Sequence, residues 1–398
     1  MSDPIYDICV VGGAGHVGAP LAVVLASRGF RTLMYDVNET AVSTILAGRF
    51  PFIEAGGESV LKKALADGRL FGSSNRADVA RAETVVVTIG TPIDEFQNPM
   101  WDAVTRCVAE LLPHLSSTKL LILRSTVSPG TTERLQRFLV DKGFDLPVAF
   151  CPERVVQGQA IDEIQRMPQI ISGTSQIAEE RAAQVFERVA TSLVRMKPIE
   201  AEFAKLFCNA YRYIQFAASN QFFMMAQSAG CDYQRIVAGI KHDYPRMSGF
   251  PSAGFTAGPC LLKDTLQLAA GSNYQFGLGY GAIHVNEGLP AFVVDDIQRR
   301  FPLGEMTVGI LGMAFKAGSD DMRSSLSYKL KKLLRLYARD VLTTDPLVTA
   351  DPDLLPLDEV IAKADLLVIG APHSEYAALP VSGKPVIDIW NVFHPPAC

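Results

Sequence analysis

The hydrophobic positions in the first third of the chain fall into short β-branched runs separated by helical stretches. This alternation is typical of a parallel β-sheet covered by helices. The clearest helix is predicted over 15–27, where it is entered through a glycine turn. The strands are predicted at 6–12, 32–37, 84–90, 120–126, 147–151 and 169–173.

Residues 200–230 predict one long helix, because this run contains no proline and no glycine before its end. At 1.5 Å per residue such a helix spans about 40 Å. It is apolar on more than one face, which is too much for a helix with one solvated side. It is therefore interpreted either as a helix buried between two domains or as a dimer seam, and the two interpretations are compatible.

The last hundred residues return to the alternating pattern, with strands predicted at 307–312, 340–346, 365–371 and 385–391. This pattern indicates a second, smaller α/β unit. The sequence therefore predicts an α/β protein with three regions, at 1–199, 200–298 and 299–398.

Composition limits the class of protein. The chain has 398 residues, is 48% hydrophobic and 20% charged, and carries a net charge of −5. These values are typical of a soluble globular protein, and they offer no basic surface for nucleic acid. The N-terminus lacks the pattern of a secretion signal, and no apolar run approaches the roughly 20 residues that cross a bilayer. We expect a cytoplasmic protein that does not bind a membrane.

The seven cysteines are dispersed, and no pair has the spacing of metal ligands. An odd, scattered set also argues against a disulfide framework. The sequence therefore predicts no metal site, and it predicts a reducing compartment in which a thiol can react.

A glycine-rich turn follows the first predicted strand in the sequence GGAGHVG. Gly13, Gly15 and Gly18 have the G-x-G-x-x-G spacing of a dinucleotide site. In that site the first glycine makes the tight turn, the second admits a pyrophosphate and the third packs the helix against the strand. Asp36, 18 residues beyond Gly18, closes the next predicted strand, where an acid can bind the adenosine ribose.

An acid at that position repels a 2′-phosphate, which favours NAD over NADP. His16 and Val17, inside the same turn, are predicted to line the cofactor site. The alternative is a glycine turn that binds no ligand.

Thr91 and Thr126 follow the ends of two further predicted strands. Ligands bind at the carboxyl edge of a doubly wound sheet, so both threonines are predicted to meet the nicotinamide half of the cofactor. Helix N-capping explains either threonine nearly as well.

Cys260 lies after a glycine-rich stretch and just before Lys263 and Asp264. A helix that begins near the cysteine would lower the pKa of its thiol below about 8.5. A thiolate beside a nicotinamide can capture an aldehyde as a thiohemiacetal, which is then oxidised to a thioester that water cleaves. The alternative is a small buried apolar residue.

Four further segments occur together with the glycine turn: CPERVVQGQA at 151–160, EAEFAKLFCNA at 200–210, AGPCLLKDT at 257–265 and GMAFKAGSDDMRSS at 312–325. In this order and spacing they resemble the UDP-glucose/GDP-mannose dehydrogenase family. The resemblance covers nearly the whole chain. It implies an N-terminal NAD-binding Rossmann domain, a central helical dimerisation region and a smaller Rossmann-like domain that binds the UDP-sugar.

Members of this family oxidise C6 of a nucleotide-linked hexose to a carboxylate with two NAD. The resemblance therefore implies an oxidoreductase of polysaccharide biosynthesis that works as a homodimer or a higher homo-oligomer.

The resemblance also implies roles for individual residues. Cys260 matches the nucleophile, Lys205 and Asn209 match the pair that stabilises the oxyanion at C6, and Asp264 matches the acid that activates water. Thr126 matches a threonine that positions this water, and Glu153 a glutamate that accepts a proton or orients the water. Without the resemblance, Lys205 could be a solvated charge, Asn209 a packing amide and Glu153 a surface acid.

The resemblance further implies contacts with the nucleotide-sugar. Lys316 and Arg323 match basic residues of that site, and Arg246 matches an arginine that reaches the substrate of the neighbouring subunit. Phe255 and Gly258, in the segment before Cys260, are also predicted to contact the substrate. The second α/β unit has no full glycine fingerprint, which favours UDP over a second NAD there.

The chain departs from the family pattern P-E-F-L-R-E at 152–157, where Gln157 replaces the second glutamate. A mechanism that needs two glutamates is therefore doubtful. The CPER form resembles the branch that handles UDP-N-acetylhexosamines, such as UDP-N-acetylmannosamine, and Arg154 would then meet the N-acetyl carbonyl or a phosphate. The alternatives are a UDP-glucose 6-dehydrogenase, a single-step dehydrogenase of the β-hydroxyacid or 6-phosphogluconate type, and a non-catalytic nucleotide-sugar sensor.

Overall fold

The computed structural model describes residues 5–94, 100, 102–256, 258–273, 275–379 and 383–393. The chain divides into two compact units, Met1–Cys208 with Leu266–Asn273 and Asn209–Thr265 with Tyr274–Cys398. The predicted central region, 200–298, is therefore shared between the two units.

The first unit contains an eight-stranded sheet with the order β3-β2-β1-β4-β5-β6-β7-β8. Its strands are β1 (Tyr6–Val11), β2 (Thr32–Tyr35), β3 (Leu70–Ser73), β4 (Ala82–Val87), β5 (Leu120–Leu123), β6 (Val148–Phe150), β7 (Gln169–Gly173) and β8 (Leu193–Arg195). The strands from β3 to β6 are parallel, whereas β7 runs antiparallel to β6. The predicted α/β fold and its six strands are confirmed, while β3, β8 and the antiparallel pair were not predicted.

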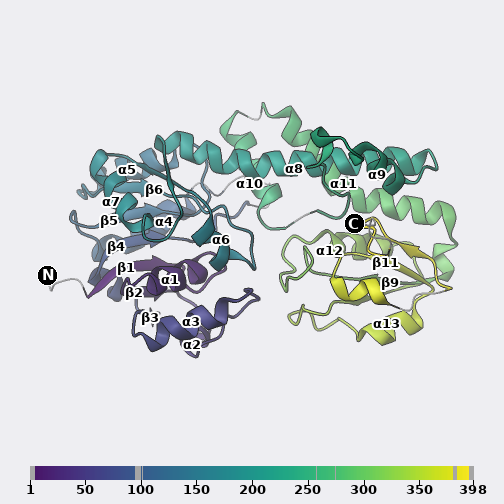
Figure 1. Ribbon diagram of the computed structural model, residues 1–398, viewed down its shortest axis with the longest axis horizontal. Coiled ribbons are helices and arrows are strands. Elements are labelled where there is room, and N and C mark those ends of the chain that lie inside the picture. The colour runs from purple at the N-terminus through teal and green to yellow at the C-terminus, as the bar shows by residue number, and fades with distance from the viewer. Residues whose placement is uncertain are drawn as a thin grey trace. The chain divides into compact units, whose positions relative to one another are not determined.

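Helices cover both faces of this sheet (Figure 1). They are α1 (Gly18–Ser27), α2 (Glu39–Leu46), α3 (Gly57–Ala66), α4 (Ala103–Leu111), α5 (Thr131–Asp141), α6 (Ala160–Arg166) and α7 (Gln176–Phe186). Along β1, Ile8 and Val10 pack into the core beneath α1, whereas Cys9 and Val11 pack into the core beneath α4 and α5. A strand buried on both faces explains why the first apolar run is continuous rather than alternating.

The long helix α8 runs from Pro198 to Ser228, two residues earlier at each end than predicted. Proline is tolerated at its first position, since the N–H there has no helical partner. Tyr213 is fully buried, whereas Phe207 and Tyr211 are 55% and 63% exposed. The helix therefore has both a buried face and an exposed aromatic face.

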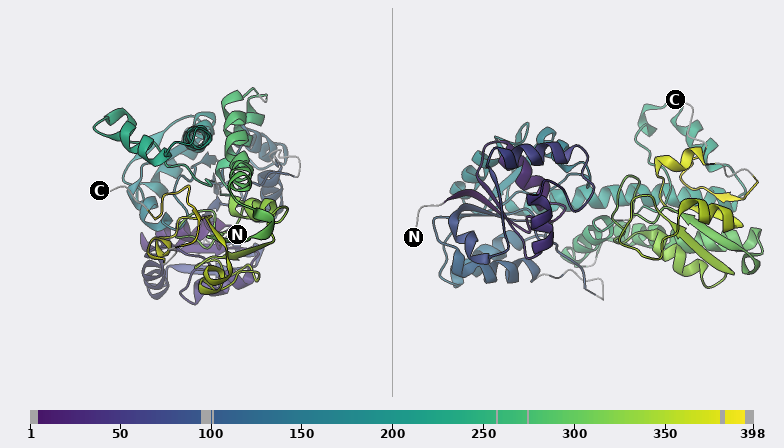
Figure 2. Two further views of the ribbon diagram at one scale, coloured as in Figure 1. Left: turned by 90° about the vertical axis from the view of Figure 1, so that its right-hand side faces the viewer. Right: turned by 90° about the horizontal axis from the view of Figure 1, so that it is seen from below.

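The second unit contains a four-stranded parallel sheet with the order β10-β9-β11-β12 (Figure 2). Its strands are β9 (Thr307–Leu311), β10 (Asp340–Thr344), β11 (Leu366–Ile369) and β12 (Val386–Ile387). The helices beyond α8 are α9 (Tyr233–Lys241), α10 (Leu261–Gly271), α11 (Gly277–Arg300), α12 (Leu326–Leu334) and α13 (Leu357–Lys363). The prediction of a second, smaller α/β unit is confirmed.

Short 3₁₀ helices lie at Arg76–Arg81, Leu112–His114, Pro245–Met247, Leu303–Glu305 and Ser374–Ala378. Across the described ranges, none of the helices has the combination of length and hydropathy that spanning a bilayer requires.

Candidate active site

The glycine turn between β1 and α1 is held by close backbone packing. A Cβ at Gly18 would lie 2.1 Å from the Gly12 carbonyl oxygen, and one at Gly13 would lie 2.6 Å from the Val10 carbonyl oxygen. Gly15 differs, because the nearest atom to its Cβ position is 3.5 Å away. The packing role predicted for Gly18 and the open side predicted for Gly15 therefore agree with the geometry.

The tight turn itself belongs to Gly12, which the fingerprint spacing did not single out. Gly12 has φ +77°, the left-handed region that favours glycine. Gly13 instead leaves no room for a side chain, so the role predicted for Gly13 is corrected. The doubled glycine in the sequence was the signal for Gly12.

Asp36 follows β2 and contacts the glycine turn. Its Oδ2 accepts a 3.0 Å hydrogen bond from the Ala14 N–H, and its Oδ1 accepts one of the same length from the Asn38 N–H. Asp36 and Gly15 both line a pocket of about 540 Å³ at the carboxyl edge of the sheet. The pocket, the open side of Gly15 and the acid fit an adenosine ribose and pyrophosphate.

His16 and Val17 are half-buried beside this turn. The His16 ring packs edge-on against Phe52, with 4.2 Å between the ring centroids. Val17 is the residue that precedes α1. Both lie where the sequence predicts them, next to the glycines.

Thr91 and Thr126 are brought together by a hydrogen bond. The Thr91 hydroxyl donates to the Thr126 carbonyl oxygen at 2.6 Å, and Gln267 Nε2 donates to the Thr91 carbonyl oxygen at 3.4 Å. The capping alternative is wrong for both threonines, because the residues that precede α4 and α5 are Asp102 and Gly130. Thr91 is buried and Thr126 is half-buried.

Glu153 is buried against Arg124, so it is not a surface acid. Glu153 Oε2 accepts hydrogen bonds from Arg124 Nε at 2.9 Å and from Arg124 Nη2, while its Oε1 accepts from the N–H groups of Arg154 and Val155. Arg124 is 1% exposed and also donates to Gln169 Oε1 at 2.9 Å. No local pattern in the sequence points to Arg124, because its partners lie 29 and 45 residues away.

Lys205 lies on α8 and is only 8% exposed, so it is not a solvated helix charge. Within the part of the chain that the structure describes, no hydrogen bond or ion pair involves its ammonium group. Leaving a buried charge without a partner costs free energy unless a ligand supplies one. Lys205 is therefore the kind of group that a reaction site uses.

Asn209, one turn after Lys205 on α8, contacts Asp264 on α10. Asn209 Nδ2 donates to Asp264 Oδ2 at 2.5 Å, and Lys263 Nζ lies 3.0 Å from Asp264 Oδ1. Asp264 is fully buried. Asn209 thus binds a buried carboxylate rather than serving only as a packing amide.

Cys260 is exposed and directly precedes α10, so it is not a small buried apolar residue. Burial raises the pKa of the Cys107 thiol to about 11 and that of Cys151 to about 12, and it raises the pKa of Cys9 as well. These three thiols are poor nucleophiles near neutral pH. Cys260 instead is exposed at the start of a helix, where the first backbone N–H groups have no helical partner.

The loop from 313 to 325 packs against the segment before Cys260. A Cβ on Gly258 would lie 2.7 Å from the Phe315 ring, and the Lys316 Nζ lies 5.8 Å from the centre of that ring. The Asp321 carboxylate, which Arg323 Nη2 contacts at 2.7 Å, raises the pKa of Arg323, with a smaller contribution from Cys260. The second unit therefore brings Gly258, Cys260 and Arg323 close to one another.

The other three residues predicted to contact the substrate differ in how exposed they are. Phe255 is buried in the hydrophobic core of the second unit, so its ring is not open to a ligand. Arg246 is exposed in the 3₁₀ helix at Pro245–Met247. Arg154 is half-buried, and its guanidinium donates to the Pro168 carbonyl oxygen.

The predicted residues thus form two sets. The first unit holds the glycine turn, Asp36, Thr91, Thr126 and the Arg124–Glu153 pair, whereas the second holds Cys260, Asp264 and the loop from 313 to 325. Helix α8 carries Lys205 in the first unit and Asn209 in the second. Helix α10, which follows Cys260, ends in the first unit.

Known proteins match this arrangement along its length. Residues 6–190 match the NAD binding domain of the UDP-glucose/GDP-mannose dehydrogenase family, residues 199–287 its central domain and residues 309–395 its UDP binding domain. UDP-N-acetyl-D-mannosamine dehydrogenase of Pyrococcus horikoshii is 29% identical over 384 residues, covering 92% of this chain and 90% of that protein.

Solved structures of dehydrogenases share the fold. The structure of UDP-D-ManNAc dehydrogenase from Pyrococcus horikoshii has a TM-score of 0.86 at 28% identity, covering 94% of this chain and 91% of that one. The structure of a UDP-glucose dehydrogenase from Pyrobaculum islandicum has a TM-score of 0.89 at 25% identity, covering 99% and 96%.

Proposed function

Because the chain belongs to the UDP-glucose/GDP-mannose dehydrogenase family, we propose that it oxidises C6 of a UDP-N-acetylhexosamine to the carboxylate through a thioester on Cys260. The observation that carries this proposal is the exposed Cys260 at the start of α10, with Asn209-bound Asp264 four residues later. UDP-N-acetylmannosamine is the favoured substrate.

NAD is the cofactor of this family, and the first unit fits it. The pocket beside Gly15 and Asp36 receives the adenosine half, and Asp36 favours NAD because its charge repels a 2′-phosphate. Thr91 and Thr126 follow β4 and β5 at the same edge of the sheet, where the nicotinamide half would lie. When bound, NAD accepts a hydride in each of the two oxidations.

Cys260 carries the covalent steps. After the first oxidation turns the C6 alcohol into an aldehyde, the thiolate adds to the aldehyde carbon, which forms a C–S bond and an oxyanion. The second oxidation converts this thiohemiacetal into a thioester. Water then breaks the C–S bond, which releases the carboxylate and restores the thiol.

Lys205 and Asn209 stabilise the oxyanion. The Lys205 ammonium has no partner among the described residues, and the Asn209 carboxamide has a second N–H besides the one that Asp264 accepts. Removing one such donor from an oxyanion site typically costs about 2.7 to 4 kcal/mol of transition-state stabilisation.

Asp264 and Thr126 serve the hydrolysis of the thioester. Asp264 is fully buried and held by Asn209 and Lys263, which supports its role as the acid that activates water. Glu153 is proposed to orient the water molecule rather than to accept a proton. Its two oxygens already accept from the Arg124 guanidinium and from two backbone N–H groups, so its lone pairs are filled.

Lys316, Arg323 and Arg246 bind the nucleotide part of the substrate in this proposal. Lys suits a point-charge contact and Arg a bidentate contact with phosphate. The segment CPER at 151–154 and the relatives that are named for UDP-N-acetylmannosamine favour an N-acetylhexosamine, with Arg154 near the sugar. UDP-glucose is the second candidate, because the Pyrobaculum structure is similar over 99% of the chain.

A homodimer through α8 is part of the proposal. Phe207, Tyr211, Phe222 and Met225 are each at least 50% exposed and lie within a few turns of the helix. Exposed aromatic residues of this density mark contact surfaces. Arg246 would then reach the substrate of the partner subunit.

Three functional regions, at 1–199, 200–298 and 299–398, follow from this assignment, with the first binding NAD, the second carrying the dimer surface and the third binding UDP. The match of the family's three domains to 6–190, 199–287 and 309–395 supports the division. The reactive thiol requires a reducing compartment, so the proposal includes a cytoplasmic location.

The deciding experiment counts NADH per molecule of sugar oxidised. A panel of UDP-glucose, UDP-GlcNAc, UDP-ManNAc, UDP-GalNAc and GDP-mannose is incubated with NAD and followed at 340 nm. Two NADH per sugar, with UDP-ManNAc turned over best, is the expected result. One NADH per sugar would indicate a single-step dehydrogenase, and binding without turnover would indicate a sensor.

Cys260→Ser tests the covalent step against Cys208→Ser, a matched control at an exposed cysteine of α8. Acid formation should collapse in the Cys260 variant and stay near the wild-type rate in the Cys208 variant. Undiminished acid production by Cys260→Ser would refute the thioester.

A further inference from the structure

Each of the two α/β units has an aspartate directly after the strand that pairs with its first strand. Asp36 follows β2 and accepts the Ala14 N–H beyond β1, while Asp345 follows β10 and accepts the N–H groups of Met313 and Ala314 beyond β9, at 2.7 and 2.9 Å. In both sheets the strand that precedes the aspartate pairs with the first strand of its unit. Asp345 is thus the counterpart of the acid that faces the cofactor pocket in the first unit.

The two aspartates differ in what else they contact. Asp36 lines a pocket, whereas the side chain of Asp345 is 0% exposed. Asp345 Oδ1 accepts from the Leu347 and Val348 N–H groups at 2.8 and 3.0 Å. Burial acts to raise the pKa of Asp345, but hydrogen bonds from His373 and from the Ala314 and Leu347 N–H groups hold it at about 2. Both carboxylate oxygens of Asp345 therefore already accept hydrogen bonds from the protein, so Asp345 does not bind a ribose.

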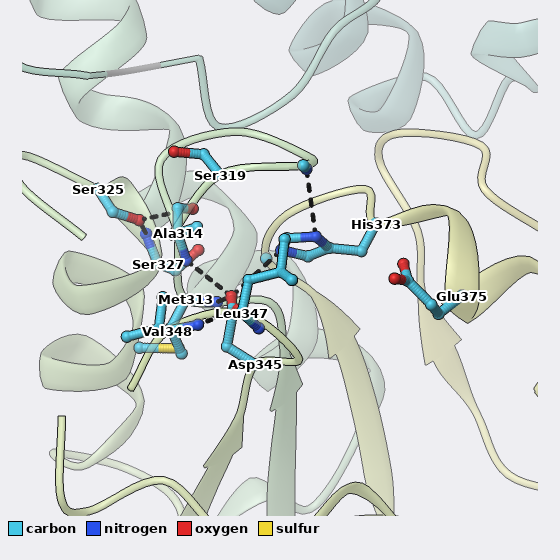
Figure 3. A network of polar contacts seen from close by, with 12 residues as sticks. Met313, Ala314, Ser319, Ser325, Ser327, Asp345, Leu347, Val348, His373 and Glu375 are labelled. Carbon is cyan, nitrogen blue, oxygen red and sulfur yellow. Dashed lines mark hydrogen bonds and ion pairs between the residues drawn. The ribbon is translucent and has the colours of Figure 1, made fainter. Parts of the chain in front are cut away.

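His373 completes this network from the loop after β11 (Figure 3). It is 1% exposed, and its Nε2 lies 3.2 Å from Asp345 Oδ2. Its Nδ1 accepts from the Gly318 N–H at 3.4 Å. Because Nδ1 accepts, the neutral ring carries its hydrogen on Nε2, where it donates to Asp345.

Asp345 and His373 both hold the loop from 313 to 325. Asp345 holds the start of the loop at Met313 and Ala314, and His373 holds Gly318. The end of the loop returns to the start, since the Ser325 hydroxyl donates to the Ala314 carbonyl oxygen at 3.2 Å. Lys316 lies midway between the two anchored points, Ala314 and Gly318.

We propose that His373 is a positioning residue for nucleotide binding, which bridges Asp345 and the Gly318 N–H and thereby fixes the Lys316 segment against the UDP moiety. The inference rests on the proposed function. Lys is a flexible point charge that loses rotamer freedom on binding, so a backbone already fixed on both sides lowers the free-energy cost of contact with a phosphate. A purely structural His373 would stabilise the unit without changing its affinity for UDP.

Two isosteric variants separate the two hydrogen bonds. His373→Asn places a carbonyl oxygen near the Nδ1 position, so it keeps the acceptor for Gly318 and loses the donor to Asp345. His373→Gln places an amide nitrogen near the Nε2 position, so it keeps the donor and loses the acceptor. The dissociation constant of UDP is measured by calorimetry on the full chain, together with that of NAD and the melting temperature.

We expect the two variants to rank in opposite order by UDP affinity and by melting temperature. His373→Gln should weaken UDP binding three- to tenfold, the range for one lost hydrogen bond, and leave the melting temperature near wild type. His373→Asn should bind UDP within about twofold of wild type but melt several degrees lower, because a buried carboxylate has lost a donor. The affinity for NAD should not change in either variant.

Asp365→Asn is the matched control. Asp365 Oδ2 accepts the Thr307 N–H at 2.7 Å at the opposite end of the same sheet. This variant should lower the melting temperature without changing the affinity for UDP. UDP affinity within twofold of wild type in His373→Gln, or affinity that falls in step with melting temperature in all three variants, would overturn the inference. A wild-type chain that binds no UDP would overturn the proposed function as well.

Discussion

Asn209 Nδ2 and Asp264 Oδ2 are joined by a 2.5 Å hydrogen bond, although 55 residues separate them in the sequence. Both side chains are buried, so removing the donor leaves the carboxylate under-satisfied. Asn209→Ala should lower the free energy of unfolding by about 1–3 kcal/mol and lower kcat together with it. Urea denaturation and steady-state kinetics measure the two effects.

Arg212→Ala is the control, because Arg212 is exposed on the same helix. It should change the unfolding free energy by no more than about 0.5 kcal/mol. Equal losses in the two variants would mean that the bond to Asp264 contributes nothing.

Lys205→Met should separate activity from stability. The ammonium has no partner among the described residues, so an apolar side chain of similar length removes a buried charge without breaking a contact. The melting temperature should stay the same or rise, while kcat should fall by about 10²-fold or more, as expected for a lost oxyanion donor. A variant that instead binds UDP-sugar more weakly and retains kcat would assign Lys205 to binding.

Gly15→Ala and Gly18→Ala form a matched pair in one turn. At Gly18 the new Cβ would lie 2.1 Å from the Gly12 carbonyl oxygen, so the turn must shift, and the chain should lose at least about 1–3 kcal/mol of stability. At Gly15 the nearest atom is 3.5 Å away, so the fold should tolerate the methyl group. Gly15→Ala should nevertheless weaken NAD binding, which fluorescence titration measures, because the methyl group occupies the approach to the pyrophosphate. Unchanged NAD affinity would place the pyrophosphate elsewhere.

Acid should destabilise the second unit through Asp345. Hydrogen bonds hold its pKa at about 2, below the ordinary value of 3.8, so the folded state favours the charged form. This contribution to stability is complete above pH 4 and is lost as the pH falls from about 4 to 2. Asp345→Asn should be less stable than wild type at neutral pH, and the difference in melting temperature should shrink across that window. A constant difference from pH 5 to pH 2 would contradict this account.

The hydrophobic pattern was sufficient for the long helix and the buried strands, and insufficient for the strands that are largely exposed. The helix α8 has no interior glycine or proline, so its length follows from the sequence alone. The strands β3 and β8 consist mostly of half-buried or exposed residues, so no continuous apolar run marks them, whereas the equally short β6 is fully buried and was predicted. The antiparallel direction of β7 depends on which strand it pairs with, and no local pattern carries that information.

The candidate site residues that belong to a local sequence motif could be predicted. The glycine turn, Asp36 and Cys260 each have a local signature, whereas Arg124 and His373 act through partners that are distant in sequence. A buried arginine in a strand end gives no sign of the carboxylate that it holds. Such contacts become visible only when the fold brings the partners together.

The packing of Gly18 on Gly12 also separates two tasks that a cofactor site must perform. The turn is locked by backbone contact, while Asp36, at the end of the next strand, touches it only through one N–H of Ala14. Redesign of cofactor preference can therefore start from the end of β2 and leave the glycines untouched. The acid proposed to recognise the ribose is free to vary, whereas the glycines that shape the turn are not.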